Sequence, residues 1–377
     1  MKNLDFVFTD EYFRFDYGPT HPLKIDRLKL TFDLMKVYGL FDHTGLTLVR
    51  PFMASEEEVS VYHSPDYLKV LKEANEGKWE SSFLRYGLGF GDNPVFRGLW
   101  DWSLLVCGGA LLGAKKICEK EVETVFNIAG GLHHAHPSKA SGFCYLNDPV
   151  LAIKYFNKQG LRITYVDIDA HHGDGVERAF YQTDQVLTIS IHQDGNTLFP
   201  GTGFIYETGT GKGEGYSINV PLLPGADDDV FKEAIDSIVI PFLKAFKPDI
   251  LVTQLGVDTF RSDPLANLNL TTNGFSYSIS KFKDLFLPWL ALGGGGYNIP
   301  NVARAWTLAL GIMLDLELED KLPPEVKKLF APHNYLGQNL RDIPYSSPLN
   351  LKGRILEDVR DKITWLEKTC LPKIASH

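Results

Sequence analysis

The stretch that decides the fold is Ile163-Thr-Tyr-Val-Asp-Ile-Asp-Ala-His-His-Gly-Asp-Gly175. It opens with a run of apolar and β-branched residues, which is typical of a strand buried on both faces. Carboxylates and imidazoles then crowd the end of that strand. Burying such groups unpaired is costly, so they are usually paired or coordinate a metal. We therefore interpret this stretch as a core strand that carries a metal site to the edge of a sheet.

Strands of the same kind recur along the chain, and a helical pattern follows each of them. This alternation predicts an α/β fold with an open, mostly parallel β-sheet and helices on both faces. No internal repeat or long Pro/Gly-rich linker divides the sequence, so we treat residues 1–377 as a single domain. We expect strands near 122–129, 162–168, 186–192, 249–257 and 289–293, and helices near 101–119, 149–158, 228–246, 276–286 and 302–315.

Polar residues close or follow each of these expected strands. In a parallel sheet the carboxyl ends of the strands lie on one edge, and ligands bind at that edge. Five separate segments are therefore expected to converge on one pocket: 130–134, 167–174, 190–192, 256–258 and 293–297.

The composition narrows the class of function. A net charge of −9 argues against a general nucleic-acid binder, which needs a basic face, although an acidic rim could attract a cationic substrate. No apolar run approaches a membrane span, and the first residues lack the apolar core of a signal peptide. The four cysteines show no CxxC spacing, which indicates a reducing compartment. We expect a cytoplasmic protein with no direct nucleic-acid or membrane partner, and its oligomeric state stays open.

Asp169, His171 and Asp258 are the predicted metal ligands. An aspartate and a histidine two positions apart can turn toward the same side. Two carboxylates and one imidazole leave a position for water, as catalytic rather than structural sites do. Zn²⁺ is the default ion, and the hard carboxylate oxygens leave Fe²⁺ open. The plainer alternative is that Asp169 caps the following turn and His171 is a core histidine with satisfied hydrogen bonds.

The adjacent histidines His133 and His134 supply acid–base chemistry in this interpretation. Each ring needs a partner that fixes its tautomer, and we expect two dyads, His133 with Asp167 and His134 with Asp174. It stays open whether one of the two is merely a solvated loop residue. Tyr297 follows a run of four glycines and could donate a hydrogen bond to a developing oxyanion, or it could be an ordinary loop aromatic.

The combined motifs resemble those of the zinc-dependent histone deacetylase superfamily, most closely its class I branch and the bacterial histone deacetylase-like and acetoin-utilization relatives. The similarity runs from Tyr17 to near Leu366, and the motifs together are highly specific. The resemblance implies an arginase/deacetylase-like fold that hydrolyses acyl-lysine amides. The matching segments are Gly130-Gly-Leu-His-His-Ala135, Gly142-Phe-Cys-Tyr-Leu-Asn147, 167–175, 199–203 and Leu292-Gly-Gly-Gly-Gly-Tyr297.

The resemblance also implies a role for each matching residue. His134 would be general base and then general acid, His133 would act mainly electrostatically, and Tyr297 would polarise the acetyl carbonyl. Zinc would be held by Asp169, His171 and Asp258. The substrate channel would be lined by Gly142, Phe143, Phe199 and Leu265, with Asp92 at its rim and Arg27 at an inner cavity for acetate exit. From the residues alone, core packing is an equally good account of Phe143 and Phe199.

Structural potassium is a further expectation from the resemblance, at two sites. The first would use Asp167, Asp169, His171, Ser190 and Ile191, and the second Phe180, Thr183, Val186 and Tyr216.

At three positions the sequence differs from residues that set substrate or partner preference in related enzymes. Leu265 stands where polyamine-selective relatives carry an acidic gatekeeper, which weakly disfavours an acetylpolyamine. Pro264 and Pro300 stand where nuclear class I enzymes carry arginines for an inositol phosphate, so we expect no corepressor complex of that kind. The expected substrate is an acetylated lysine protein or peptide, or else a small acetylated amine.

Two alternatives compete with this interpretation. An arginase-like ureohydrolase would use two metals and an Asp-x-Asp motif. In this chain Gly256 occupies the position of the first aspartate of that motif. A non-catalytic protein that binds an acylated ligand would be expected to lack a ligand or Tyr297, and none of these residues is missing.

Overall fold

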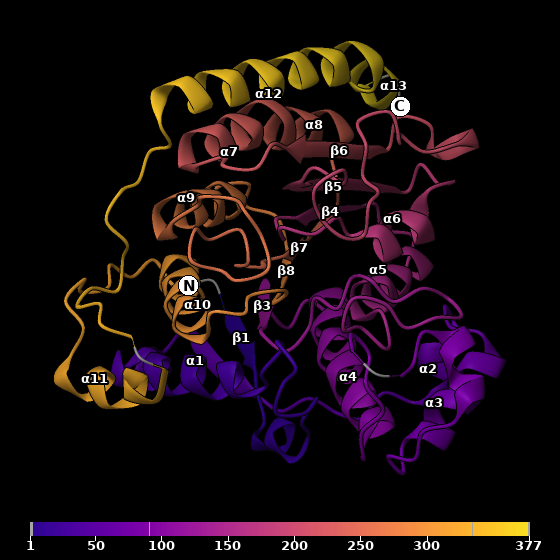
Figure 1. Cartoon of the computed structure of the whole chain (residues 1–377). Coiled ribbons are helices and arrows are strands. Elements are labelled where there is room, and N and C mark those ends of the chain that lie inside the picture. Colours follow the sequence, from indigo (N-terminus) through magenta and orange to yellow (C-terminus); the bar gives the residue numbers. More distant parts are fainter. Residues whose placement is uncertain (1–2, 90, 334, 376–377) are drawn as a thin grey trace.

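The computed structural model describes residues 3–89, 91–333 and 335–375. One sheet of eight strands forms the centre of the molecule, in the order β2-β1-β3-β8-β7-β4-β5-β6 (Figure 1). All neighbouring strands are parallel. The strands are β1 (Leu4–Val7), β2 (Leu46–Val49), β3 (Thr124–Asn127), β4 (Ile163–Asp167), β5 (Val186–Gln193), β6 (Ser217–Leu222), β7 (Ile250–Gln254) and β8 (Trp289–Leu292).

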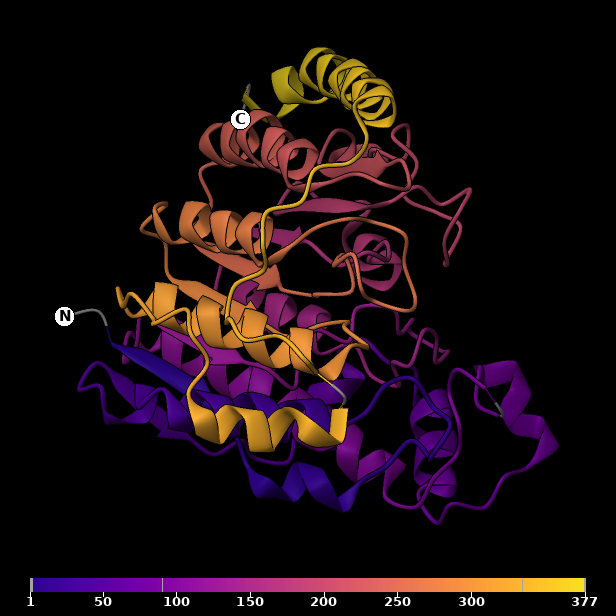
Figure 2. The same cartoon turned by 60° about the vertical axis from the view of Figure 1, so that its left-hand side comes forward.

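Helices cover both faces of the sheet, as its continuous apolar strands require. On one face α4, α5 and α6 pack against the strands around Val125, Tyr165 and Leu290. On the other face α1, α10, α9 and α7 form a row of neighbouring helices, which Figure 2 shows stacked one above the other. The helices are α1 (Asp26–Val37), α2 (Glu56–Ser60), α3 (Pro65–Ala74), α4 (Leu99–Cys118), α5 (Asp148–Lys158), α6 (Asp174–Phe180), α7 (Asp228–Ala234), α8 (Ile240–Phe246), α9 (Thr272–Lys283), α10 (Ile299–Met313), α11 (Pro324–Phe330), α12 (Leu349–Thr369) and α13 (Leu371–Ala375).

Two helices begin directly after segments that matter for function, and capping side chains fix where they begin. The Asn147 side chain accepts a hydrogen bond from Val150 N at the start of α5. Asn298 does the same for Asn301 N at the start of α10. Both helices also carry a proline in the first turn, where its missing N–H costs nothing.

The predicted fold class is confirmed, and the sheet is entirely parallel. The five expected strands are present, with ends that differ by up to three residues. Strands β1 (Leu-Asp-Phe-Val) and β2 (Leu-Thr-Leu-Val) were missed because a polar residue interrupts each short apolar run, and β6 was missed because it contains Pro221. The helix expected over 228–246 is interrupted by a π-helical turn, Ile235–Val239, just before Pro241.

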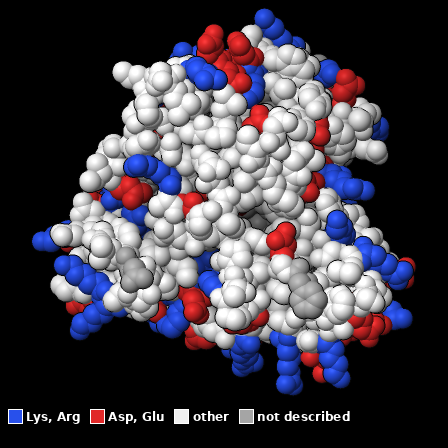
Figure 3. Space-filling model, viewed as in Figure 1, with Lys and Arg blue, Asp and Glu red and all other residues white. Residues whose placement is uncertain are grey.

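No helix in the described ranges has both the length and the apolar character needed to cross a membrane. On the face shown in Figure 3, lysine and arginine side chains lie mainly toward the outline and form no continuous patch.

Candidate active site

The register of three central strands brings the functional segments together. Asp167, the last residue of β4, pairs with Ser190 of β5 on one side and with Gln254 of β7 on the other. The chain leaves β4 and β7 at this same edge and continues directly to Asp169 and Asp258. The sheet therefore sets the spacing of the site before any side chain is considered.

Asp169, His171 and Asp258 form a buried cluster beyond this edge. Their ligand atoms all lie within 4.8 Å of one another. His171 Nδ1 is 3.1 Å from Asp169 Oδ1 and 2.9 Å from Asp258 Oδ2. The remaining carboxylate oxygens are held by the protein, since Asp169 Oδ2 accepts from Gln254 Nε2 at 2.6 Å and Asp258 Oδ1 accepts from Ala170 N at 2.7 Å. The three donor atoms are thus pre-oriented toward one point.

The charges of this cluster suit a cation. Burial lowers the pKa of His171, but the two carboxylates outweigh it and raise the pKa to about 10. Burial and the neighbouring charge of Asp169 raise the pKa of Asp258 to about 7. Both shifts arise because two carboxylates are crowded together in a buried place, an arrangement that favours added positive charge, and two carboxylates with one imidazole are a donor set that Zn²⁺ accepts.

Two glycines leave room for the cluster. A Cβ atom at Gly256 would collide with the Asp169 carboxylate, and one at Gly295 would collide with Asp258. An aspartate at position 256, which the two-metal alternative requires, would not fit this arrangement.

His133 and His134 each bond a carboxylate through Nδ1. His133 Nδ1 is 2.7 Å from Asp167 Oδ2, and His134 Nδ1 is 2.7 Å from Asp174 Oδ1. Because Nδ1 is engaged in both rings, Nε2 is the nitrogen left to face the site. All four side chains are largely buried.

The two dyads differ in basicity. Burial lowers the pKa of His133, but the carboxylates of Asp167 and Asp169 outweigh it and raise the pKa to about 9. Burial and the charge of His133 lower the pKa of His134 to about 4, against the opposing pull of Asp174. The pKa values of two adjacent histidines are therefore shifted in opposite directions from that of a free imidazole.

The loop that carries both histidines is fixed by two residues at the start of α5. Asp148 accepts hydrogen bonds from Gly131 N at 2.9 Å and Leu132 N at 2.8 Å. Asn147 Nδ2 donates to the carbonyl oxygens of His133 and Ala135, both at 3.0 Å. These four hydrogen bonds fix the backbone that carries the two imidazole rings.

Tyr297 borders the same channel as His134. Its backbone N donates to Asp263 Oδ2 at 2.7 Å, which anchors the glycine-rich segment after β8. Its ring stands edge-on to Phe143, with centroids 5.6 Å apart. Burial and the charges of Asp258 and Asp169 raise its pKa, so the phenol stays a neutral O–H donor.

A channel of about 220 Å³ leads to this point. At its wall, Gly142 and Phe143 both have positive φ, and a Cβ atom at Gly142 would collide with His134. Phe143 is held in this strained conformation by Tyr17, whose hydroxyl donates to Phe143 O at 3.0 Å. The channel is lined by Asp92, His134, Gly142, Phe143, His171, Leu198, Phe199, Leu265 and Tyr297.

A smaller inner cavity lies beyond the channel. Arg27 borders it, buried, with Nη1 donating to Gly296 O at 3.2 Å and the guanidinium 5.4 Å from the ring centroid of Trp306. His133, His134 and Tyr297 also border this cavity.

Comparison with known proteins yields one family. A profile of the histone deacetylase domain matches residues 21–313. Human histone deacetylase 1 is 40% identical over 356 residues, which cover 91% of this chain and 72% of that protein. The probable histone deacetylase 1-B of Xenopus laevis is 38% identical over 371 residues, covering 95% of this chain and 76% of that protein.

The chain belongs to the histone deacetylase family. The crystal structure of a histone deacetylase homologue from Aquifex aeolicus agrees, with a TM-score of 0.87, 32% identity and coverage of 97% of this chain and 100% of that one. The protein is accordingly a hydrolase that deacetylates lysine.

The residues expected to hold potassium in this deacetylase fall into two groups. In the first group, Asp169 and His171 belong to the candidate metal cluster, Asp167 ends β4, and Ser190 and Ile191 lie within β5. Phe180 ends α6, Thr183 follows it, Val186 begins β5 and Tyr216 precedes β6. Potassium at either place stays a prediction.

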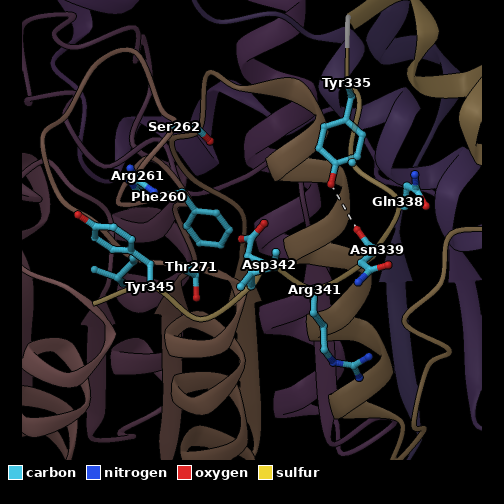
Figure 4. Close-up of a pocket in the computed structure, with 13 residues that line it drawn as sticks. Phe260, Arg261, Ser262, Thr271, Tyr335, Gln338, Asn339, Arg341, Asp342 and Tyr345 are labelled. Carbon is cyan, nitrogen blue, oxygen red and sulfur yellow. Dashed lines mark hydrogen bonds between the residues drawn. The ribbon is translucent and has the colours of Figure 1, made fainter. Parts of the chain in front are cut away.

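A cavity of about 780 Å³, larger than the channel, lies away from this chemistry (Figure 4). Its charged groups are already paired or stacked. Asp342 accepts from Arg304 Nη1 at 2.7 Å, and Arg261 lies 4.0 Å from the ring centroid of Tyr345. Its Tyr335 hydroxyl donates to Asn339 O at 3.3 Å. No set of ligating or nucleophilic groups converges there among the described residues, so size does not identify the active site.

Sequence reasoning missed three polar residues that support the site. Gln254 holds Asp169, Asp263 anchors the backbone of Tyr297, and His136 Nε2 lies 3.2 Å from Asp174 Oδ2. Gln254 carried a usable signal, because a glutamine at the end of a fully buried and mostly apolar strand is unexpected. Asp263 and His136 lie in loops whose conformation no periodic pattern reveals.

Proposed function

We propose that this protein is a zinc-dependent amidohydrolase that removes acetyl or other acyl groups from lysine side chains of proteins or peptides. The observation that carries the proposal is the convergence of a three-donor cluster, two His–Asp dyads and a neutral phenol at the inner end of one narrow channel. Family membership supports the deacetylase chemistry.

Asp169, His171 and Asp258 would hold Zn²⁺. When bound, the ion would acidify a water molecule and polarise the acyl carbonyl. Gln254 and the backbone N–H groups that contact the two carboxylates would keep them in place, as outer hydrogen bonds do in metal sites.

His134 would act as general base and then as general acid. It lines the channel, and its lowered pKa keeps the imidazole neutral and able to accept a proton. Asp174 would hold the Nδ1–H tautomer, so that Nε2 takes the proton and later delivers it to the leaving amine. His133, with its raised pKa, would stay positively charged and stabilise developing negative charge without exchanging a proton.

Tyr297 would donate a hydrogen bond to the carbonyl oxygen as negative charge develops there. Its raised pKa keeps the proton on the phenol, and Asp263 holds the backbone that positions the ring. Removing one such donor typically costs about 10²–10³ in kcat.

The channel favours an acyl-lysine side chain. Phe143, Phe199 and Leu265 give it apolar walls, which suit a lysine stem whose charge acylation has removed. Asp92 at its opening would hold the substrate backbone, and Arg27 at the inner cavity would assist the departure of acetate. Leu265 offers no negative charge for the second amine of a polyamine.

Metal and partner preferences complete the proposal. Zn²⁺ is the expected ion, Fe²⁺ is the alternative, and K⁺ would be structural. With Pro264 and Pro300 in place of arginines, we expect no inositol-phosphate corepressor, and we expect the protein to work in the cytoplasm.

The test is acetate release from an acetyl-lysine peptide by purified protein. Metal-stripped, zinc-restored and zinc-loaded Tyr297→Phe samples would be compared, with iron-restored protein as a second metal arm. We expect activity only with metal and a loss of about 10²–10³ in kcat for Tyr297→Phe. A folded, zinc-loaded wild type that turns over no peptide would overturn the peptide substrate and direct the same assay to small acetylated amines.

A further inference from the structure

The Asp174 carboxylate is shared between two histidines. Oδ1 is 2.7 Å from His134 Nδ1, and Oδ2 is 3.2 Å from His136 Nε2. Because a carboxylate only accepts, both imidazoles must donate to it. The combined hydrogen bonds of His134 and His136 hold the pKa of Asp174 far below its usual range, although burial opposes this. By contrast, His133 is the one histidine bonded to Asp167 among the described residues.

The position of His136 is fixed by its own backbone. His136 N donates to Lys139 O at 2.9 Å across a tight turn that contains Pro137. His63 Nδ1 donates to His136 O at 3.1 Å, while His63 Nε2 accepts from Asn147 N at 3.0 Å. Burial lowers the pKa of His63 to about 3, so this ring stays neutral and keeps that tautomer. These contacts fix the backbone of His136 and so hold its ring beside Asp174.

A second cavity lies on the other side of His136. It measures about 730 Å³ and shares no described lining residue with the substrate channel. His136 Nδ1 is buried and has no hydrogen-bond partner among the described residues. The cavity is lined by His136, His172, Asp174, Glu177, Arg178, Tyr181, Gln182, Thr202 and Glu207.

We propose that His136 is a positioning residue for deacetylation: it holds the second oxygen of Asp174 so that the first oxygen stays aligned with His134 Nδ1. The inference rests on the proposed role of His134 as general base. Without His136, the second oxygen would face this polar cavity and the carboxylate would be held at one oxygen only. Rotation of the carboxylate would then misorient the His134 ring, with no contact to the substrate being lost.

The test compares three variants of the zinc-loaded protein. His136→Met fills the space without a donor, and His136→Gln keeps an N–H that can reach Asp174. Ser138→Ala lies on the same loop and breaks only an exposed hydrogen bond to Ser64, so it controls for loop disturbance. Steady-state kinetics on the acetyl-lysine peptide and the NMR signal of the His134 Nδ1–H proton would be measured for each.

We expect His136→Met to lower kcat roughly tenfold with KM unchanged, which is the low end for residues that orient catalytic groups. Its Nδ1–H signal should broaden or shift, while His136→Gln should restore both kcat and signal toward wild type, and Ser138→Ala should leave both unchanged. A kcat within twofold of wild type and an unchanged Nδ1–H signal in His136→Met would overturn the proposal, as would equal losses in the Met and Gln variants.

The NMR signal does not depend on turnover. If wild type proves inactive on the peptide, the proposed substrate fails. The response of the Nδ1–H signal to His136→Met then still decides whether His136 positions the dyad.

Discussion

The two His–Asp dyads have hydrogen bonds of the same length, 2.7 Å between Nδ1 and the carboxylate oxygen, but their surroundings differ. Asp167 is fully buried and also accepts hydrogen bonds from Tyr165 Oη at 2.7 Å and Asp169 N at 3.1 Å. The side chain of Asp174 is 14% exposed, borders a polar cavity and shares its charge with His136. One dyad is thus enclosed by fixed donors, and the other lies between the channel and a second cavity.

In the proposed mechanism, this difference separates two chemical tasks on adjacent residues. The enclosed dyad concentrates negative charge around His133 and keeps its proton in place. The more open dyad leaves His134 neutral and able to exchange a proton. Environments that push two pKa values apart are how one site assigns an electrostatic role and an acid–base role to residues of the same type.

The largest effect on stability should come from the enclosed dyad. Asp167→Asn leaves one acceptor oxygen where two now serve three donors, since His133 Nδ1 and Tyr165 Oη bond Oδ2 and Asp169 N bonds Oδ1. We expect a loss of about 3–5 kcal/mol in the free energy of unfolding. Asp174→Asn should lower the free energy of unfolding by less than about 2 kcal/mol, because water in the adjacent cavity can form hydrogen bonds with the new amide. Urea unfolding of both zinc-loaded variants would measure this, and equal losses would contradict the comparison.

A smaller effect should appear in the pH dependence of stability, and it should come from Asp148, whose carboxylate holds the loop that carries His133 and His134. Burial raises the pKa of Asp148 to about 7, despite its two backbone donors. The unfolded value is about 4, so the folded protein binds the extra proton between these pH values. This group therefore stabilises the fold at low pH, and the contribution declines as pH rises toward 7.

The expected slope is at most about 1.4 kcal/mol per pH unit. Urea unfolding at several pH values between about 5 and 7 would measure it in wild type and Asp148→Asn. The difference in unfolding free energy between wild type and the variant should change across this range in favour of the variant at higher pH. A difference that is constant with pH would show that Asp148 is ionised throughout.

The fold and the centre of the site could be predicted because they depend on strand ends. Asp167, Asp169 and His171 follow a buried strand directly, and Asp258 follows its neighbour in the sheet, so a parallel arrangement brings them together. Their convergence needs only the periodicity of the strands and the shared edge.

The parts that were not predicted depend on loop conformation. Asp263 reaches the backbone of Tyr297, 34 positions away, and His136 reaches Asp174 through a turn fixed by His63. Neither contact follows from a spacing or a charge pattern. The short strands β1 and β2, the last two at one end of the sheet, were missed for a related reason, since register with neighbours defines them more than their own sequence.

The measurement that tests the central claim most directly is acetate release from a saturating acetyl-lysine peptide by zinc-loaded His134→Ala and His133→Ala, each confirmed to be folded. Because His134 alone is assigned proton transfer, its loss should lower kcat about 10³-fold, within the usual range for general acid–base groups. The loss from His133→Ala should be at least tenfold smaller. Equal losses, or a larger loss from His133→Ala, would contradict the assignment of the two dyads.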